Sequence, residues 1–288
     1  MQSRSLKADS LLLLTSLIWG FAFVAQREGM KSMEPFAFNG IRFLLGSLVL
    51  AGFILIRFGK NAFIDLKNSS LLKAGLILGL LLFTGASLQQ LGIVHTTAGK
   101  AGFITGLYVV FVPLLGLIIR QRTGIFTWAG AMLAVAGLYL LSIKGLFTVE
   151  YGDFLVFLGA IVWAIHVLAI GKLAPAHQPY LLALMQYFIC GLFSLIIGFS
   201  TETVILSGIQ NAALPIAYGG FLSVGIAYTL QIYAQKIAKP SHAAILLSLE
   251  AVFAAIGGWL VLHEILTIKE LSGCLLMICG MFVAQLKH

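Results

Sequence analysis

The chain has 288 residues, of which 60% are hydrophobic and only 10% are charged, and its mean hydropathy is +1.03. This composition leaves too little polar surface to cover a water-soluble globule, so it excludes an ordinary soluble domain and predicts an all-α integral membrane protein. A formal net charge of +8 would suggest a nucleic-acid partner in a soluble protein. Here the basic residues stand singly between apolar segments, as loop charges do, so we expect a lipid bilayer as partner and no nucleic acid.

Ten segments stay apolar for roughly 17 to 23 residues, the length that crosses about 30 Å of hydrocarbon as a helix. The loops between them are short, so the sequence offers no soluble domain. Lysine and arginine concentrate on the side of the N-terminus, which predicts that both termini are cytoplasmic. In chain order the predicted spans are 10–26, 36–56, 73–93, 98–119, 125–143, 153–173, 180–199, 212–234, 243–262 and 269–286.

The second half of the sequence repeats the first. The stretch DFLVFLGAIVWAIHVLAIG (153–171) matches DSLLLLTSLIWGFAFVAQR (9–27) at its aspartate, two leucines, the tryptophan and an alanine. Further along, LEAVF (249–253) falls on LYVVF (107–111) at nearly the same spacing. Because the matches extend over the whole chain, they indicate an internal duplication.

We expect an N-terminal repeat over 1–146, with helices one to five, and a C-terminal repeat over 147–288, with helices six to ten. Because five is an odd number, the second repeat must enter the membrane from the opposite side. The predicted fold is therefore ten transmembrane helices in two inverted five-helix repeats. This architecture is typical of alternating-access carriers, whose substrate site lies near the midplane between the repeats.

Four stretches carry a family resemblance: SLIWGFAFVA (16–25), IVW (161–163), AGKAGFITGLYVVFVPLLG (98–116) and LSLEAVFAAIGGWLVLHE (247–264). In these stretches the chain resembles the EamA-type members of the drug/metabolite transporter superfamily. The resemblance implies ten helices in two inverted repeats. It also implies, for a bacterial member, the export of amino acids or other metabolites across the inner membrane.

Two positions bear on the shape of individual helices. Family members commonly carry Glu-Pro in the ninth helix, whereas here Glu250 is followed by Ala251, so we expect a straighter ninth helix. Pro113 in the fourth span removes one backbone hydrogen bond and is expected to kink that helix.

Polar side chains inside the spans are the candidates for a substrate cavity, because an ionisable group in hydrocarbon costs at least a few kcal/mol. At 1.5 Å per residue, Arg42 lies roughly 10 Å below the outer face and Glu250 roughly 10 Å above the cytoplasmic face. We therefore expect no salt bridge between them and assign them to opposite ends of one cavity. The other candidates are Trp19, Asn39, Gln90, Tyr108, Trp163, His166, Gln186, Tyr187 and Tyr228.

Each candidate has a structural alternative. Arg42 is shallow enough to snorkel toward the outer headgroups. Glu250 is too short to snorkel, so it is either protonated, hydrogen-bonded or in a wet cavity. His166 and the tryptophans are also interpreted as packing residues of the bundle, and the glutamines and tyrosines as interhelical hydrogen-bond partners.

The sequence contains no catalytic motif and no ATP-binding loop, and its three cysteines, Cys190, Cys274 and Cys279, lie in apolar stretches. We expect no enzyme activity, no cofactor and no metal, and predict a secondary transporter. A zwitterion such as an amino acid would suit Arg42 and Glu250, and Glu250 and His166 are candidates for proton coupling. A passive channel or facilitator is the nearer alternative, and an intramembrane enzyme is the distant one.

The predicted fifth and tenth helices carry matching glycines and few polar groups, so we expect them to lie outside the cavity. The glycines are Gly130 and Gly137 in the fifth helix, and Gly273 and Gly280 in the tenth. A monomer of ten helices can already enclose a site. If a homodimer forms, the family resemblance favours these two helices as its interface.

Overall fold

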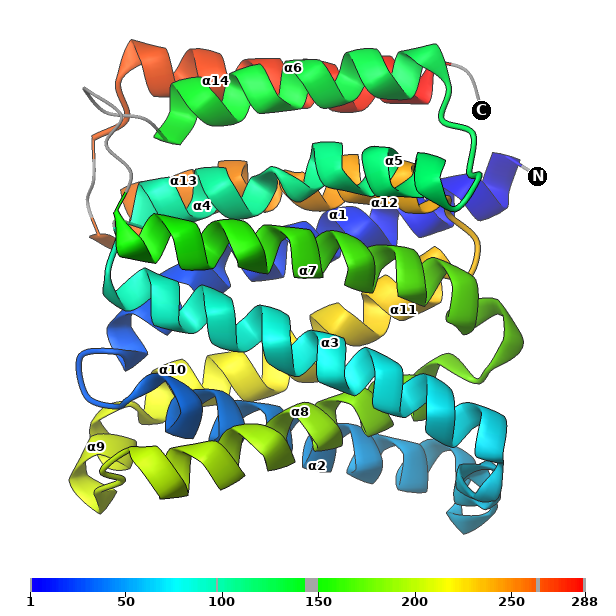
Figure 1. Ribbon diagram of the computed structural model, residues 1–288, viewed down its shortest axis with the longest axis vertical. Helices are drawn as coiled ribbons and strands as arrows, with labels where there is room; N and C mark the ends of the chain where they lie inside the picture. The colour runs from blue at the N-terminus through cyan, green and yellow to red at the C-terminus, as the bar shows by residue number, and fades with distance from the viewer. Residues whose placement is uncertain (1, 97, 143–149, 263–264, 287–288) are drawn as a thin grey trace.

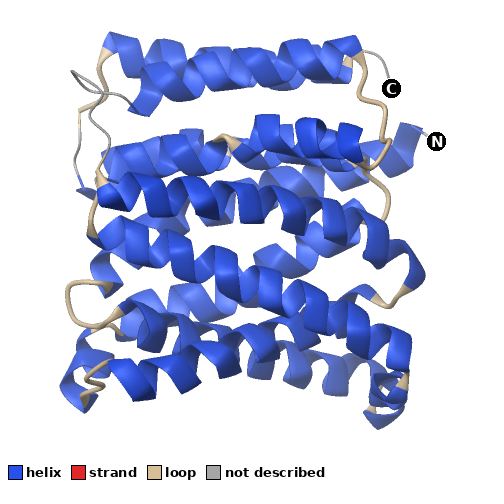
Figure 2. Cartoon of the chain, viewed as in Figure 1, coloured by secondary structure: helices blue, strands red, loops and turns tan. Residues whose placement is uncertain are grey.

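The computed structural model describes residues 2–96, 98–142, 150–262 and 265–286, and over these ranges the chain is helical with no strand (Figure 2). The helices lie side by side along a common direction, and the start of α1 and the end of α14 lie at the same end of the bundle (Figure 1). Nine helical spans within the described ranges are long and apolar enough to cross a membrane. The predicted all-α class is confirmed, and the protein is a multi-pass membrane protein.

The first half contains six α-helices and one short 3-10 helix. They are α1 (Gln2–Gly29), α2 (Pro35–Phe58), η1 (Lys60–Lys67), α3 (Ser69–Val94), α4 (Ala98–Gly106), α5 (Tyr108–Ile118) and α6 (Ile125–Ser142).

The second half contains the remaining α-helices, a short 3-10 helix and one π-helical segment, η3. They are α7 (Tyr151–Leu173), η2 (Ala174–Ala176), α8 (Pro179–Thr201), α9 (Leu206–Asn211), α10 (Ala213–Ala217), η3 (Tyr218–Tyr228), α11 (Thr229–Gln235), α12 (Pro240–Ser248), α13 (Glu250–Leu262) and α14 (Ile268–Gln285).

The observed helices follow the predicted spans, with three differences in detail. The fourth span is α4 and α5, the ninth is α12 and α13, and the eighth is α10, η3 and α11. The fifth is α6, whose apolar part, Ile125–Leu141, is shorter than the nine candidate spans. The predicted repeat boundary, at 146 and 147, lies outside the described residues, so the division into two repeats stays a prediction.

The fourth and ninth spans are interrupted at matched positions of the sequence repeat. Between α4 and α5, the Leu107 N–H bonds the carbonyl of Ile104 at 3.2 Å; between α12 and α13, the Leu249 N–H bonds Leu246 at 3.3 Å. Such i to i−3 bonds tighten one turn of a helix. The ninth span is therefore interrupted without a proline, and its expected straightness stays a prediction. The interruption of the fourth span likewise precedes Pro113, which lies inside α5.

The matching glycines pack α6 against α14 at one edge of the bundle (Figure 1). A Cβ atom on Gly130 would lie 2.5 Å from the carbonyl oxygen of Gly280, and one on Gly137 would lie 2.5 Å from that of Gly273. These pairings make the two helices antiparallel, with their backbones in contact. The glycines thus form the contact between α6 and α14 within one chain, and a dimer through these helices would have to use their outer faces.

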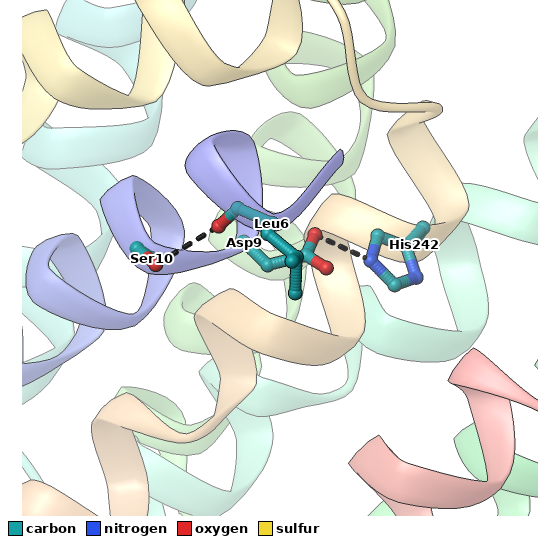
Figure 3. Close-up of polar contacts among 4 residues, drawn as sticks. All are labelled: Leu6, Asp9, Ser10 and His242. Atoms are coloured by element: carbon teal, nitrogen blue, oxygen red, sulfur yellow. Dashed lines mark hydrogen bonds and ion pairs between the residues drawn. The ribbon is translucent and has the colours of Figure 1, made fainter. Parts of the chain in front are cut away.

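Two polar contacts join the halves at the ends of the spans. Near the start of α1, the Asp9 carboxylate lies 2.8 Å from Nε2 of His242 in the first turn of α12 (Figure 3). Asp153, which matches Asp9 in the sequence repeat, accepts a hydrogen bond from the hydroxyl of Thr96, just ahead of α4. Each contact therefore ties the first helix of one half to the fourth span of the other half.

The glycine contact predicts the stability of two matched variants. Gly137→Ala should lower the free energy of unfolding by about 1–3 kcal/mol, because the new methyl group meets the backbone of α14. Gly52→Ala in α2 meets nothing within 4 Å, so it should be neutral or stabilising by up to about 1 kcal/mol through helix propensity. Thermal unfolding of both variants in detergent measures the difference, and equal melting temperatures would contradict the close packing of α6 on α14.

Candidate functional site

A small cavity lies among the spans and draws its walls from both halves of the chain. Its volume, measured as the space open to the centre of a water molecule, is about 50 Å³. One water needs roughly 10–15 Å³ on this measure, so the cavity holds a few waters or a small solute. In the described part of the chain, α6, α8 and α14 contribute no lining residue, which agrees with the expected position of the fifth and tenth helices outside the cavity.

Seven of the eleven candidate residues from the sequence line this cavity. They are Trp19, Arg42, Tyr108, Trp163, His166, Tyr228 and Glu250. The structure brings them together from six different helices, although their role in binding a substrate stays a prediction.

The other four candidates are buried behind the lining or away from it. Asn39 accepts a hydrogen bond from Arg42 Nε at 3.0 Å, and Gln186 Oε1 lies 2.9 Å from Nε2 of His166. Tyr187 shares a hydrogen bond of 2.8 Å with Thr229. Asn39 and Gln186 therefore support lining residues. Gln90 is fully buried, and its amide has no partner among the described residues.

Arg42 is a buried cation without a carboxylate partner. Its side chain is 3% exposed, and its guanidinium carbon lies 4.7 Å from the ring centroid of Phe43. Gly219 in η3 makes room for it, because a Cβ atom there would lie 3.1 Å from Arg42 Cδ. No Asp or Glu of the described ranges forms an ion pair with Arg42. The snorkelling interpretation is therefore wrong, since the side chain points into the protein.

Glu250 is a buried acid without a cation partner. It begins α13 and is 7% exposed, and its Oε1 accepts a hydrogen bond from the Tyr108 hydroxyl at 3.2 Å. Tyr108 begins α5 and matches Glu250 in the sequence repeat. No basic side chain in the part of the chain that the structure describes forms an ion pair with Glu250. As expected, Arg42 and Glu250 line one cavity without a salt bridge.

An aromatic wall centres on Tyr228. The ring centroid of Trp19 lies 4.5 Å from that of Tyr228, and the ring of Trp163 stacks on Tyr228 at 6.3 Å. The indole N–H of Trp19 donates to the carbonyl of Ser223 at 3.3 Å, and that of Trp163 donates to Gln89 Oε1 at 2.9 Å. The two repeat-matched tryptophans therefore both contact one tyrosine and are both anchored by an indole hydrogen bond.

Sequence reasoning missed five polar lining residues, which are Gln26, Gln89, Thr105, Ser223 and Gln231. The depth estimate selected Gln90, but depth does not say which side of a helix a residue occupies, and Gln89 is the one that faces the cavity. Helical spacing was the available signal for Gln26. The lining residues of α1 are Trp19, Ala22, Phe23 and Gln26, which is the i, i+3, i+4, i+7 pattern of one helix face.

The cavity is lined mainly by polar and aromatic side chains. It combines a cation, an acid, several amides and an aromatic wall in a small buried space. Within the described ranges no group of three or more His, Cys, Asp or Glu side chains could hold a metal ion.

Comparison with known proteins bears on the whole chain. The profile of the EamA-like transporter family matches it twice, over residues 6–143 and 150–285. A protein of Archaeoglobus fulgidus, named an uncharacterized transporter, is 32% identical over 99% of this chain and 87% of its own length. The uncharacterized inner membrane transporter YedA of Escherichia coli is 28% identical over 73% of this chain and 65% of its own. A crystal structure of a protein 18% identical to this chain shares the fold, with a TM-score of 0.81 and coverage of 97% and 96%.

Two adjacent glutamines give a test of the site. Gln89→Leu removes the acceptor of the partly buried Trp163 N–H, so it should destabilise the protein by about 1 kcal/mol. Gln90→Leu replaces a buried amide that has no partner, so it should be neutral or stabilising. Thermal unfolding of the two variants in the same detergent measures this contrast, and a larger loss in Gln90→Leu would show that the glutamines are assigned to the wrong sides of α3.

Proposed function

The chain belongs to the EamA-like transporter family and is a membrane transporter, and we propose that it is a secondary carrier of small zwitterionic metabolites, such as amino acids. The observation behind this proposal is that Arg42 and Glu250 line one small cavity while neither has a partner of opposite charge. An uncompensated charge in a membrane interior is costly. A ligand with a carboxylate toward Arg42 and an ammonium group toward Glu250 would compensate both.

We propose export across a bacterial inner membrane, with both termini in the cytoplasm. The family resemblance supports export, and the E. coli relative is named an inner membrane transporter. The distribution of lysine and arginine supports the orientation of the termini. The start of α1 and the end of α14 also lie at one end of the bundle (Figure 1).

We propose that the fold is ten transmembrane helices in two inverted repeats, 1–146 and 147–288. An even number of crossings brings both ends of a chain to one side, so α6 would be the tenth span. The two family matches support two repeats. The reciprocal contacts support inversion, because Gly130 meets Gly280 and Gly137 meets Gly273 from antiparallel helices.

Alternating access is supported by the two interrupted spans. Discontinuous helices near the midplane are common in carriers, where the ends of half-helices face the substrate. Here α5 and α13 start at Tyr108 and Glu250, which are hydrogen-bonded to each other and line the cavity. The lining residues in the described part of the chain come from both of its halves, and we propose that a monomer is competent. A homodimer would form through the outer faces of α6 and α14.

Proton coupling through Glu250 is part of the proposal, with His166 as a second candidate. A carboxylate binds an ammonium group as an anion, whereas its neutral form carries a proton. Proton and substrate would therefore compete for the same side chain, and exchange of one for the other links transport to the proton gradient. His166 lines the same cavity and is fully buried.

Counterflow distinguishes a carrier from a channel or a passive facilitator without exchange. Liposomes containing the purified protein and loaded with unlabelled amino acids should take up labelled amino acid faster than unloaded ones, because a carrier that releases labelled substrate inside can bind unlabelled substrate for the return step.

Arg42→Gln should reduce the apparent affinity by about tenfold or more through loss of a charge-assisted hydrogen bond. The absence of trans-stimulation would favour a pore, and preferential binding of neutral sugars or large hydrophobic cations would contradict a zwitterionic substrate.

The role of Glu250 is tested by one conservative change. Glu250→Gln should abolish accumulation driven by a pH gradient, because the amide has no exchangeable acid proton. Exchange at equal pH should persist at saturating substrate, because the amide oxygen still accepts a hydrogen bond from the ammonium group. The measurement is tracer uptake into liposomes with and without the gradient, with His166→Ala in parallel. An unchanged response to the gradient would remove Glu250 from the coupling mechanism.

A further inference from the structure

Three lining side chains each carry a buried polar atom that has no hydrogen-bond partner among the described residues. The atoms are Thr105 Oγ1, His166 Nδ1 and Gln231 Oε1. The three residues are 3%, 0% and 1% exposed, respectively. Buried polar groups are normally paired, because an unpaired one loses its hydration without compensation. Because these three residues line one cavity, water or a ligand in that cavity is the available source of the missing hydrogen bonds.

The contacts of His166 determine which kind of hydrogen bond is missing. Its Nε2 lies 2.9 Å from Gln186 Oε1, and because an amide oxygen can only accept, we assign the proton to Nε2. In a neutral imidazole the other nitrogen, Nδ1, is then an acceptor. The unpaired atom of Gln231 is a carbonyl oxygen, which is also an acceptor. Both atoms therefore require a donor from the ligand.

Glu250 adds a third acceptor to the same cavity. One of its carboxylate oxygens is bonded by Tyr108, and no donor within the described ranges reaches the other. The three acceptors come from α7, α11 and α13, and all three residues line the one cavity. A primary ammonium group has three N–H donors, which is the complement of three acceptors.

We infer that His166, Gln231 and Glu250 form the binding site for a primary ammonium group, and that the carrier therefore selects primary amines over their N-methylated analogues. This inference rests on the proposed zwitterionic substrate and narrows its chemistry. A quaternary ammonium carries the same charge without any N–H group. It would leave the acceptors of His166 and Gln231 unpaired.

The aromatic wall offers the competing interpretation, because quaternary ammonium groups bind in cages of aromatic faces. The rings here pack on one another instead. Tyr228 is contacted by Trp19 and Trp163, and the centroids of Phe43 and Tyr187 lie 6.0 Å and 6.2 Å from it. Tyr228 therefore packs against these four rings, and the acceptors of His166 and Gln231 in the same cavity favour recognition by hydrogen bonds.

Binding of matched ligands to the purified, unmodified protein tests the inference. Thermal shifts with the standard amino acids first identify the strongest ligand, and titrations then compare it with its N,N,N-trimethyl betaine. The primary amine should bind at least about tenfold tighter, since it keeps hydrogen bonds to a charged group that the betaine lacks. Equal or tighter binding of the betaine overturns the inference but leaves the zwitterionic substrate intact. If no amino acid and no betaine stabilises the protein, the proposed function fails and the inference fails with it.

A pair of variants assigns the selectivity to the residues. Gln231→Leu should weaken binding of the primary amine about tenfold while leaving betaine affinity unchanged. Gln90→Leu, which removes a similarly unpaired amide outside the cavity, should change neither affinity. Unchanged selectivity in a folded Gln231→Leu variant would exclude Gln231 from the site. If that variant fails to fold, the comparison of methylated ligands on the unmodified protein still decides.

Discussion

The cost of holding a charge inside a membrane protein, away from water and from an opposite charge, governs this structure. Arg42 and Glu250 are both buried ionisable groups that carry this energetic cost, and they do not form an ion pair with each other. Each has a neutral partner instead, Asn39 for the guanidinium and Tyr108 for the carboxylate. A direct salt bridge would neutralise the cavity by itself. Because the two charges stay apart, neither is compensated within the protein, and a dipolar ligand would compensate both.

The backbone creates the room for this arrangement with small local departures from a regular helix. Gly219 lacks the Cβ atom that would press on Arg42, and η3 turns more widely than an α-helix where it presents Ser223 and Tyr228. The tightened turn at Leu249 lets a new half-helix begin at Glu250. Each departure lies beside a lining residue, as expected where function and regular geometry compete.

Matched positions of the sequence repeat carry the same side chain in one pair and different side chains in another. Tyr108 matches Glu250, and Trp19 matches Trp163. Both tryptophans contact Tyr228 and donate an indole N–H to a neighbouring residue. Of positions 108 and 250, only Glu250 is an acid. A symmetric cavity would offer the same groups at both ends. Matched positions of the two halves therefore present different chemistry to the cavity.

The sequence by itself determined that the chain lies in a lipid bilayer, where its helical spans are, and that its second half repeats its first. These features follow from hydropathy over a span and from spacing along the chain, which are local properties of the sequence. It also found most of the lining, since Arg42, His166 and Glu250 are unusual within apolar segments. Only the tertiary structure decided that Gln89 rather than Gln90 faces the cavity. The reason is that the orientation of a helix about its own axis depends on the neighbours it packs against, and in an almost uniformly apolar span the sequence carries little trace of that choice.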